Sequence, residues 1–273
     1  MSESAERTPL SELLAGFTAT ESGHRVQIPA DWLQGRAVYG GLSAALALHS
    51  AHGALDALPP LRSVQLTFIG PAGSDVELRP VLDRRGKSTA FVSVDIVSGG
   101  RLAVRAALCF GAARDSRLAA GGPLAPAVSG PETSDPFFRR GVDGRHLGPN
   151  FAQHFNSRHA AGGLPMSGAD AADFTVWLQH KDTTMADSLV GLVALADALP
   201  PAAMASFVEP APISTMTWMF DLLTGDPRTD DGWWLCRSTA DATRDGYSSQ
   251  AMTIWNRAGE PVVAGRQNVA IFY

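Results

Sequence analysis

Two stretches of the sequence decide the fold: RRGKSTAFVSVDIVSGGRLAVRAALCF (84–110) and TRDGYSSQAMTIWNRAGEPVVAGRQNVAIF (243–272). Each begins with a charged segment that ends in glycine and continues as a run in which apolar and small polar residues intermix. A glycine turn, at 99–100 in the first stretch and at 258–259 in the second, separates that run from another one. Alternation around a glycine turn predicts paired antiparallel strands. The likeness between the two stretches predicts a duplicated structural unit.

The segments that precede these stretches repeat the same order of elements. Residues 40–52, GGLSAALALHSAH, are small or apolar on nearly every face, which predicts a helix that is buried on all sides. A strand that ends in a Gly/Pro turn follows at 62–73. The second copy has a predicted helix at 185–199 and a predicted strand and turn at 213–226. The expected fold class is therefore α+β, with two tandem copies of a long buried helix wrapped by an antiparallel β-sheet.

The segment between the two copies is rich in glycine, proline, alanine and serine and has little periodicity, as is typical of a linker. We therefore expect an N-terminal unit at 1–115, a linker at 116–135 and a C-terminal unit at 136–273. The C-terminal unit carries an insertion before its helix, at 151–182, in which residues 174–180 are expected to form a strand.

Composition excludes several classes of protein. The 273 residues are 45% hydrophobic and 18% charged, which supplies a core and argues against disorder. The net charge is -5 and no basic stripe is present, so a nucleic acid is not an expected partner. No apolar run is long enough for a membrane span, and the polar N-terminus does not resemble a signal peptide. Cys109 and Cys236 lie in apolar, strand-like segments, as expected of reduced thiols in a cytoplasmic protein.

A single carboxylate, that of Asp197, lies inside the otherwise apolar segment LVGLVALADALPP (189–201). An isolated ionised carboxylate is costly to bury, so Asp197 is expected to be paired, exposed at a helix end, or functional. A negative charge near a helix C-terminus is unfavourable with the helix dipole, which weakens the account in which Asp197 only ends a helix.

The sequence resembles the double-hotdog acyl-CoA thioesterases, of the bacterial thioesterase II type. Five ordered segments carry the resemblance: VYGGLSAALALHSA, LRSVQLTFIGPAGSD, RRGKSTAFVSVDIV, LVALADALPPA and VVAGRQNVAIFY. The resemblance implies two hotdog folds in one chain and the hydrolysis of acyl-CoA to a free carboxylic acid and CoA. The attack of water on a thioester needs no metal and no redox cofactor, so none is expected, with the CoA thioester as substrate.

The resemblance also implies three catalytic residues. An aspartate on the second helix, a hydroxyl residue on the following strand and a glutamine on the last strand would hold a water near the thioester carbonyl. Asp197 and Gln267 fall on the first and third positions. An ungapped alignment puts Ile213 at the hydroxyl position, and Thr215 lies two residues further on. Because residues 213, 215 and 217 of a regular strand point to the same face, Thr215 is the expected source of the hydroxyl.

The chemistry of these residue types suits the reaction. A carboxylate in an apolar cleft has a raised pKa and can take a proton from water, and threonine and glutamine can hold the same water by hydrogen bonds. Each residue also has a structural interpretation: a helix end for Asp197, a satisfied buried amide for Gln267 and strand propensity for Thr215.

Two alternative functions stay open from the sequence. Ile213 at the hydroxyl position favours an acyl-thioester binding protein that has lost catalysis. A hotdog dehydratase or hydratase is the other alternative, although no histidine lies near Asp197 in the sequence. Exposed sheet edges and apolar outer surface predict a homo-oligomer. Four large residues are candidates for setting the depth of an acyl tunnel: Phe91, Met216, Trp218 and Met252.

Overall fold

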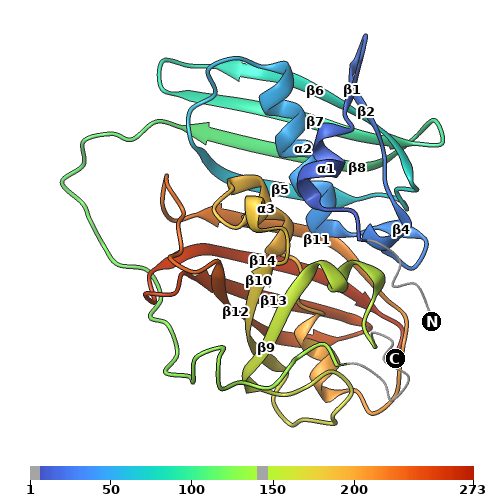
Figure 1. Ribbon diagram of the computed structural model, residues 1–273, viewed down its shortest axis with the longest axis vertical. Coiled ribbons are helices and arrows are strands. Elements are labelled where there is room, and N and C mark those ends of the chain that lie inside the picture. Colours follow the sequence, from blue (N-terminus) through green and yellow to red (C-terminus); the bar gives the residue numbers. More distant parts are fainter. Residues whose placement is uncertain (1–6, 140–146) are drawn as a thin grey trace.

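The computed structural model describes residues 7–139 and 147–273, and Figure 1 shows their arrangement. In these residues, twelve strands form one antiparallel sheet, and a separate two-stranded hairpin lies beside it. The N-terminal copy contributes the following elements: α1 (Leu10–Ala15), β1 (Thr18–Thr20), β2 (Gly23–Gln27), β3 (Leu33–Gln34), β4 (Ala37–Val38), α2 (Gly40–Ala54), β5 (Leu61–Phe68), β6 (Asp75–Arg85), β7 (Thr89–Ser98) and β8 (Arg101–Gly111).

The C-terminal copy repeats the order of the N-terminal one: two strands at the outer edge of the sheet, then a helix, a strand and a three-stranded meander. Its elements are β9 (Phe155–Gly162), β10 (Asp173–His180), α3 (Leu189–Leu195), β11 (Ile213–Leu222), β12 (Trp233–Arg244), β13 (Tyr247–Trp255) and β14 (Pro261–Ile271). The segment expected to be an insertion, 151–182, therefore carries the counterparts of β1 and β2. Short 3-10 helices occur at Ala30–Trp32, Asn150–His154, Thr183–Met185 and Ala202–Ser206. The predicted strand at 174–180 is therefore confirmed as β10, whereas the sequence analysis did not anticipate β1, β2 or β9.

The two copies join edge to edge through β5 and β11. The strand order is β1-β2-β6-β7-β8-β5-β11-β14-β13-β12-β10-β9, so one continuous sheet crosses from one copy to the other. Val64 of β5 pairs with Phe220 of β11, and both side chains are fully buried. This seam places the start of β11 beside the N-terminal copy, where it forms part of the site described below.

The helix α2 is buried on all sides, as the sequence predicts. Ten of its 15 residues are buried, and the helix packs on β6, β7 and β8 and against α3. Figure 1 shows α2 and α3 on the same side of the twelve-stranded sheet. The result is the predicted α+β architecture, in which each copy wraps a sheet around a helix. Among the described residues, no helix combines the length and hydropathy that a membrane crossing requires.

The second helix is shorter than the sequence predicts. A helix was expected over 185–199, but α3 covers only Leu189–Leu195. Ser188 caps its start, because the Ser188 hydroxyl accepts a hydrogen bond from the Gly191 N–H at 3.4 Å. A turn at 196–197 ends the helix. Pro200 and Pro201 follow, and each proline disfavours helical geometry in the residue directly before it. Asp197 consequently lies in that turn and not on the helix.

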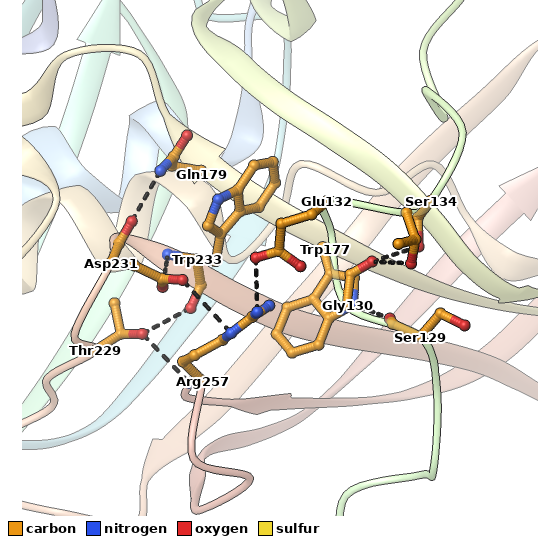
Figure 2. Close-up of polar contacts among 11 residues, drawn as sticks. Ser129, Gly130, Glu132, Ser134, Trp177, Gln179, Thr229, Asp231, Trp233 and Arg257 are labelled. Carbon is orange, nitrogen blue, oxygen red and sulfur yellow. Dashed lines mark hydrogen bonds and ion pairs between the residues drawn. The ribbon is translucent and has the colours of Figure 1, made fainter.

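The segment at 116–135 contains no helix or strand and lies along the C-terminal part of the sheet. Two indole N–H groups hold it: Trp177 donates to the Ser129 carbonyl at 2.9 Å, and Trp255 donates to the Pro123 carbonyl at 2.7 Å. Figure 2 shows Arg257 beside Trp177, 5.1 Å from the ring centroid, with an ion pair to Glu132 at 2.7 Å. The domain boundaries drawn from the sequence stay predictions.

Candidate active site

A cavity of about 570 Å³ lies where the two copies meet. Its walls come from the first residue of α2, the end of β5, the start of β11 and the segment after α3. Asp197, Thr215 and Gln267 all line it, so the structure brings together the three residues that the sequence singles out. Much of the remaining wall is apolar: Ala37, Val38, Phe68, Ile69, Pro71, Ala72, Val104, Phe138, Pro149, Phe151, Ala198, Leu199, Pro200, Pro201, Met204 and Ile213.

The Asp197 carboxylate is held from two elements that are distant in the sequence. The Gln267 side chain, on β14, donates a hydrogen bond from Nε2 to Asp197 Oδ1. The Gly41 backbone N–H, at the start of α2, donates a second hydrogen bond to the carboxylate. The Asp197 side chain is only partly exposed, because it lies deep in the protein and meets solvent through the cavity. The account in which Asp197 turns to solvent at a helix end is therefore wrong.

Glycine at 40 and 41 allows this approach. A Cβ atom at Gly40 would lie 2.5 Å from Asp197 Oδ2, and a Cβ atom at Gly41 would lie 2.3 Å from the Ala194 carbonyl oxygen. Real Cβ atoms do not come so close to other heavy atoms. A side chain at Gly41 would therefore force α2 away from the Ala194 backbone, and a side chain at Gly40 would displace the Asp197 carboxylate. The two glycines therefore let the start of α2 pack closely on the segment that contains Ala194 and Asp197. The N-terminus of α2 also directs its positive dipole at the carboxylate.

Burial raises the pKa of Asp197 to about 7, because removal from water disfavours the charged form. The hydrogen bonds from Gln267 and Gly41 act in the opposite direction and limit the rise, since both favour the carboxylate. Asp197 is therefore close to half ionised at neutral pH. A carboxyl group in this range both accepts and returns a proton near neutrality, which is the property of a general base.

Tyr39 is the other titratable group buried near Asp197 on the N-terminal side. Burial, and secondarily the charge of Asp197, raise the pKa of Tyr39 well above its ordinary value. Its hydroxyl donates to the Ala194 carbonyl at 2.9 Å, and its ring stacks on Phe151 at a centroid separation of 3.7 Å. Tyr39 therefore stays neutral and fixes the start of α2 against the segment that leads to Asp197.

A β-bulge puts Thr215 and Thr217 of β11 on different faces of the strand. Thr215 pairs with Val269 of β14, but the register then shifts, and Thr217 pairs with Asn268. The extra residue, Met216, reverses the alternation, so that Thr215 lines the cavity while Thr217 is exposed. The expectation that residues 213, 215 and 217 share one face is therefore wrong for Thr217. It holds for Ile213 and Thr215, which both line the cavity.

Gln267 faces the interior of the C-terminal copy. It pairs with Trp218 on β11 and with Gln250 on β13, and both of these side chains are about 1% exposed. Its amide N–H is satisfied by Asp197, so the structural interpretation and the functional one involve the same hydrogen bond. Gln267 also lines the cavity, and its amide oxygen retains the capacity to accept a hydrogen bond.

The four residues expected to set the depth of a tunnel do not line the large cavity. Phe91 and Met216 are 41% and 43% exposed, since β-strand alternation at Phe91 and the bulge at Met216 turn them outward. Trp218 is buried beneath the sheet, and Met252 lines a separate small cavity next to Asp197. The residues that the sequence analysis missed are aromatic residues at turns and strand ends, notably Phe68 and Phe151, which no periodic pattern identifies.

Within the described residues, no cluster of three or more histidine, cysteine, aspartate or glutamate side chains is placed to hold a metal ion. None of the described residues that line the large cavity is a histidine. Among the described residues, the wall of this largely apolar cavity therefore offers one titratable carboxyl group, that of Asp197, with the hydroxyls of Ser214 and Thr215 and the amides of Gln34 and Gln267.

Family models match both copies of the chain. The acyl-CoA thioesterase N-terminal domain matches residues 28–111, and the acyl-CoA thioesterase C-terminal domain matches residues 126–271. The chain belongs to the acyl-CoA thioesterase family. This thioesterase is accordingly a thioester hydrolase by class, and the resemblance stated from the sequence is confirmed.

Solved structures show the same fold as this thioesterase. A conserved hot dog fold protein of unknown function from Alicyclobacillus acidocaldarius superposes with a TM-score of 0.85 at 20% identity, over 96% of this chain and 97% of that chain. An acyl-CoA thioesterase II from Mycobacterium marinum superposes with a TM-score of 0.73 at 17% identity, over 96% of this chain and 98% of that chain. The dehydratase domain of RzxB from Pseudomonas fluorescens superposes with a TM-score of 0.59 at 12% identity, over 97% of this chain and 99% of that chain. A comparison with curated proteins finds no match.

Proposed function

We propose that this thioesterase hydrolyses acyl-CoA to a free carboxylic acid and CoA by activating a water molecule at Asp197. One observation carries the proposal. The Asp197 carboxylate faces an apolar cavity, accepts a hydrogen bond from Gln267 and has a pKa of about 7. Asp197 acts as the general base, and Gln267 and Thr215 hold the water.

The proposed reaction proceeds in two steps. The water oxygen attacks the thioester carbon while Asp197 removes one water proton, which produces a tetrahedral intermediate with a negatively charged oxygen. The intermediate then re-forms its C=O bond and breaks the C–S bond, and Asp197 returns the proton to the leaving sulfur of CoA. No metal ion or redox cofactor enters this sequence, so none is proposed.

In the proposed complex, the acyl chain of the substrate contacts apolar residues and its thioester carbonyl contacts polar ones. Phe68, Phe151 and Met204 supply apolar surface for the acyl chain, which gains about 25 cal/mol for each Å² of apolar surface removed from water. The reacting carbonyl would lie at the polar side, next to Asp197, Thr215 and Gln267. The test is release of free CoA thiol from acyl-CoAs of increasing chain length. Absence of release from every acyl-CoA would contradict the proposal.

Thr215→Val is expected to lower kcat about tenfold, the effect of losing one positioning hydrogen bond of roughly 1.4 kcal/mol. Valine keeps the shape of threonine and its strand propensity, so the KM and the thermal midpoint should change little. The measurement is steady-state thiol release. Ile213→Val is the matched control, since it removes one methylene from the same cavity wall and no hydroxyl. Wild-type kcat in Thr215→Val would exclude the Thr215 hydroxyl from the mechanism.

Two other functions are less well supported. A non-catalytic acyl-thioester binder was suggested by Ile213, but the Thr215 hydroxyl residue lines the same cavity as Asp197. A dehydratase is disfavoured because none of the described cavity residues is a histidine. Conversion of an enoyl-CoA to a hydroxyacyl-CoA, without thiol release, would favour the dehydratase instead.

Partners and location stay proposals. The family points to acyl-CoA as the substrate. We keep the expectation of a homo-oligomer because the sheet has two edges, at β1 and β9, and because it exposes large apolar side chains such as Phe91, Met216 and Met219. Cys109 and Cys236 are both free thiols, which suits the reducing cytoplasm. The mass in solution, measured by light scattering, tests the oligomer.

A further inference from the structure

A second, much smaller cavity lies next to Asp197, towards strands β12 and β13. Its volume is about 20 Å³, and its wall includes Asp197, Gln267, Gln250 and Ser238. A volume of at least about 10–15 Å³ in this measure holds one water molecule when two or more polar groups surround it. The large cavity and the small one share three lining residues: Asp197, Leu199 and Gln267.

Gln250 is the lining residue of the small cavity that has a buried polar atom without a hydrogen-bond partner in the described part of the chain. It is 1% exposed and pairs directly with Gln267 in the register of β13 and β14. Its Oε1 accepts a hydrogen bond from the Ala202 backbone N–H at 2.5 Å, which fixes the orientation of the amide. Its Nε2 is buried and has no hydrogen-bond partner among the described residues. A buried amide N–H without a partner destabilises the folded protein, so a partner for it is expected.

We propose that the small cavity binds one water, which accepts a hydrogen bond from Gln250 Nε2 and donates one to the Asp197 carboxylate. Gln250 is then a positioning residue: it acts on the base through a water and does not touch the substrate. The catalytic consequence rests on the proposed function, whereas the water site itself does not. Ser238, on β12, offers a hydroxyl as a further partner for the water.

The water favours the ionised form of Asp197, because a hydrogen bond donated to a carboxylate stabilises the charge. Loss of the water therefore raises the pKa of Asp197, and the base becomes active only at higher pH. The remaining titratable groups in the described residues around Asp197 do not compete with this effect. Tyr39 and Cys236 have pKa values well above their ordinary ranges and stay neutral, and Arg237 is paired with Asp173 at 3.5 Å.

The experiment compares two variants that remove the water by different routes. Gln250→Met keeps the length of the side chain but removes the donor, and Ser238→Val fills the cavity while the contact between Gln250 and Ala202 stays. Both are expected to move the acid limb of kcat/KM to higher pH by about one unit, the usual size of one hydrogen-bond effect on a carboxyl group. Ser248→Ala is the matched control, because Ser248 is buried on β13, the strand of Gln250, and does not line the small cavity.

A second readout separates this inference from the proposed function. The pKa of Asp197 is measured without substrate by carbon-13 NMR titration of labelled aspartate, with Asp197→Asn to assign the signal. The same upward shift is expected in Gln250→Met and Ser238→Val, even if the wild type hydrolyses no thioester. A purely structural role for Gln250 would lower the thermal midpoint or kcat at every pH. Unchanged pKa values of Asp197 in both variants would overturn the water site.

Discussion

Asp197→Asn is expected to lower kcat/KM for acyl-CoA hydrolysis by roughly 10²–10⁴-fold, the usual contribution of a positioned general base. Asparagine has nearly the shape of aspartate but cannot accept a proton from water. Its Oδ1 still accepts the hydrogen bond from Gln267, whereas its amide nitrogen cannot accept the one that the Gly41 N–H donates to the carboxylate. The measurement is thiol release at pH 8, where the wild-type carboxyl group is ionised.

The matched control for this variant is Asp187→Asn. Asp187 lies ten positions earlier in the sequence, is exposed and does not line either cavity next to Asp197. The two variants lose the same negative charge, so a general electrostatic effect on CoA binding would appear in both. We expect wild-type activity from Asp187→Asn. Hydrolysis by Asp197→Asn within a few-fold of wild type would remove Asp197 from the mechanism.

Gly41→Ala is expected to destabilise the protein by roughly 3 kcal/mol, as overpacking of a closed interior does. The added Cβ would lie 2.3 Å from the Ala194 carbonyl oxygen and 2.6 Å from the Tyr39 hydroxyl. The first of these is backbone, which cannot move aside without separating α2 from α3. The thermal midpoint should fall by roughly 5–10 °C for a chain of this size. Activity should fall too, since the Gly41 N–H holds the carboxylate.

Alanine is favoured over glycine in a helix by about 1 kcal/mol, so helix propensity alone would make Gly41→Ala more stable than the wild type. A loss of stability would therefore indicate a clash of the added Cβ atom. Gly53→Ala, near the other end of α2, is the matched control. Its Cβ would meet only the His24 ring, at 3.2 Å, which is the end of a side chain and not backbone. We expect an unchanged or slightly higher midpoint for Gly53→Ala. A Gly41→Ala variant that is as stable as wild type would show that the close approach of α2 to Ala194 is not required.

The fold could be predicted from the sequence because its strongest signals are local. The alternation in β7 and β8, the glycine turn at 99–100 and the apolar surface of α2 each determine an element without information from elsewhere in the chain. Duplication then fixes their order in the second copy. What could not be predicted is the edge-to-edge pairing of β5 with β11, since strand edges carry no pattern that names their partner.

The candidate site was predicted in part, for a physical reason that differs at each residue. Asp197 stands out because a lone carboxylate in an apolar segment needs an explanation. Thr217 was assigned to the wrong face because a single extra residue in β11 reverses the alternation, and no residue type at that position signals a bulge. Gln250 was missed, because a glutamine in a strand is unremarkable until its neighbours are known.

The pH dependence of thiol release tests the central claim most directly, because it asks whether the group that controls hydrolysis titrates like Asp197. Burial raises the pKa of Asp197 to about 7, and only the ionised form can act as a base. Wild-type kcat/KM should therefore be level above that pH and should fall about tenfold for each unit below it. The same measurement on Asp197→Asn should give a slow rate without this acid limb. Wild-type hydrolysis that is independent of pH between 5 and 9, or an acid limb that persists in Asp197→Asn, would contradict the account.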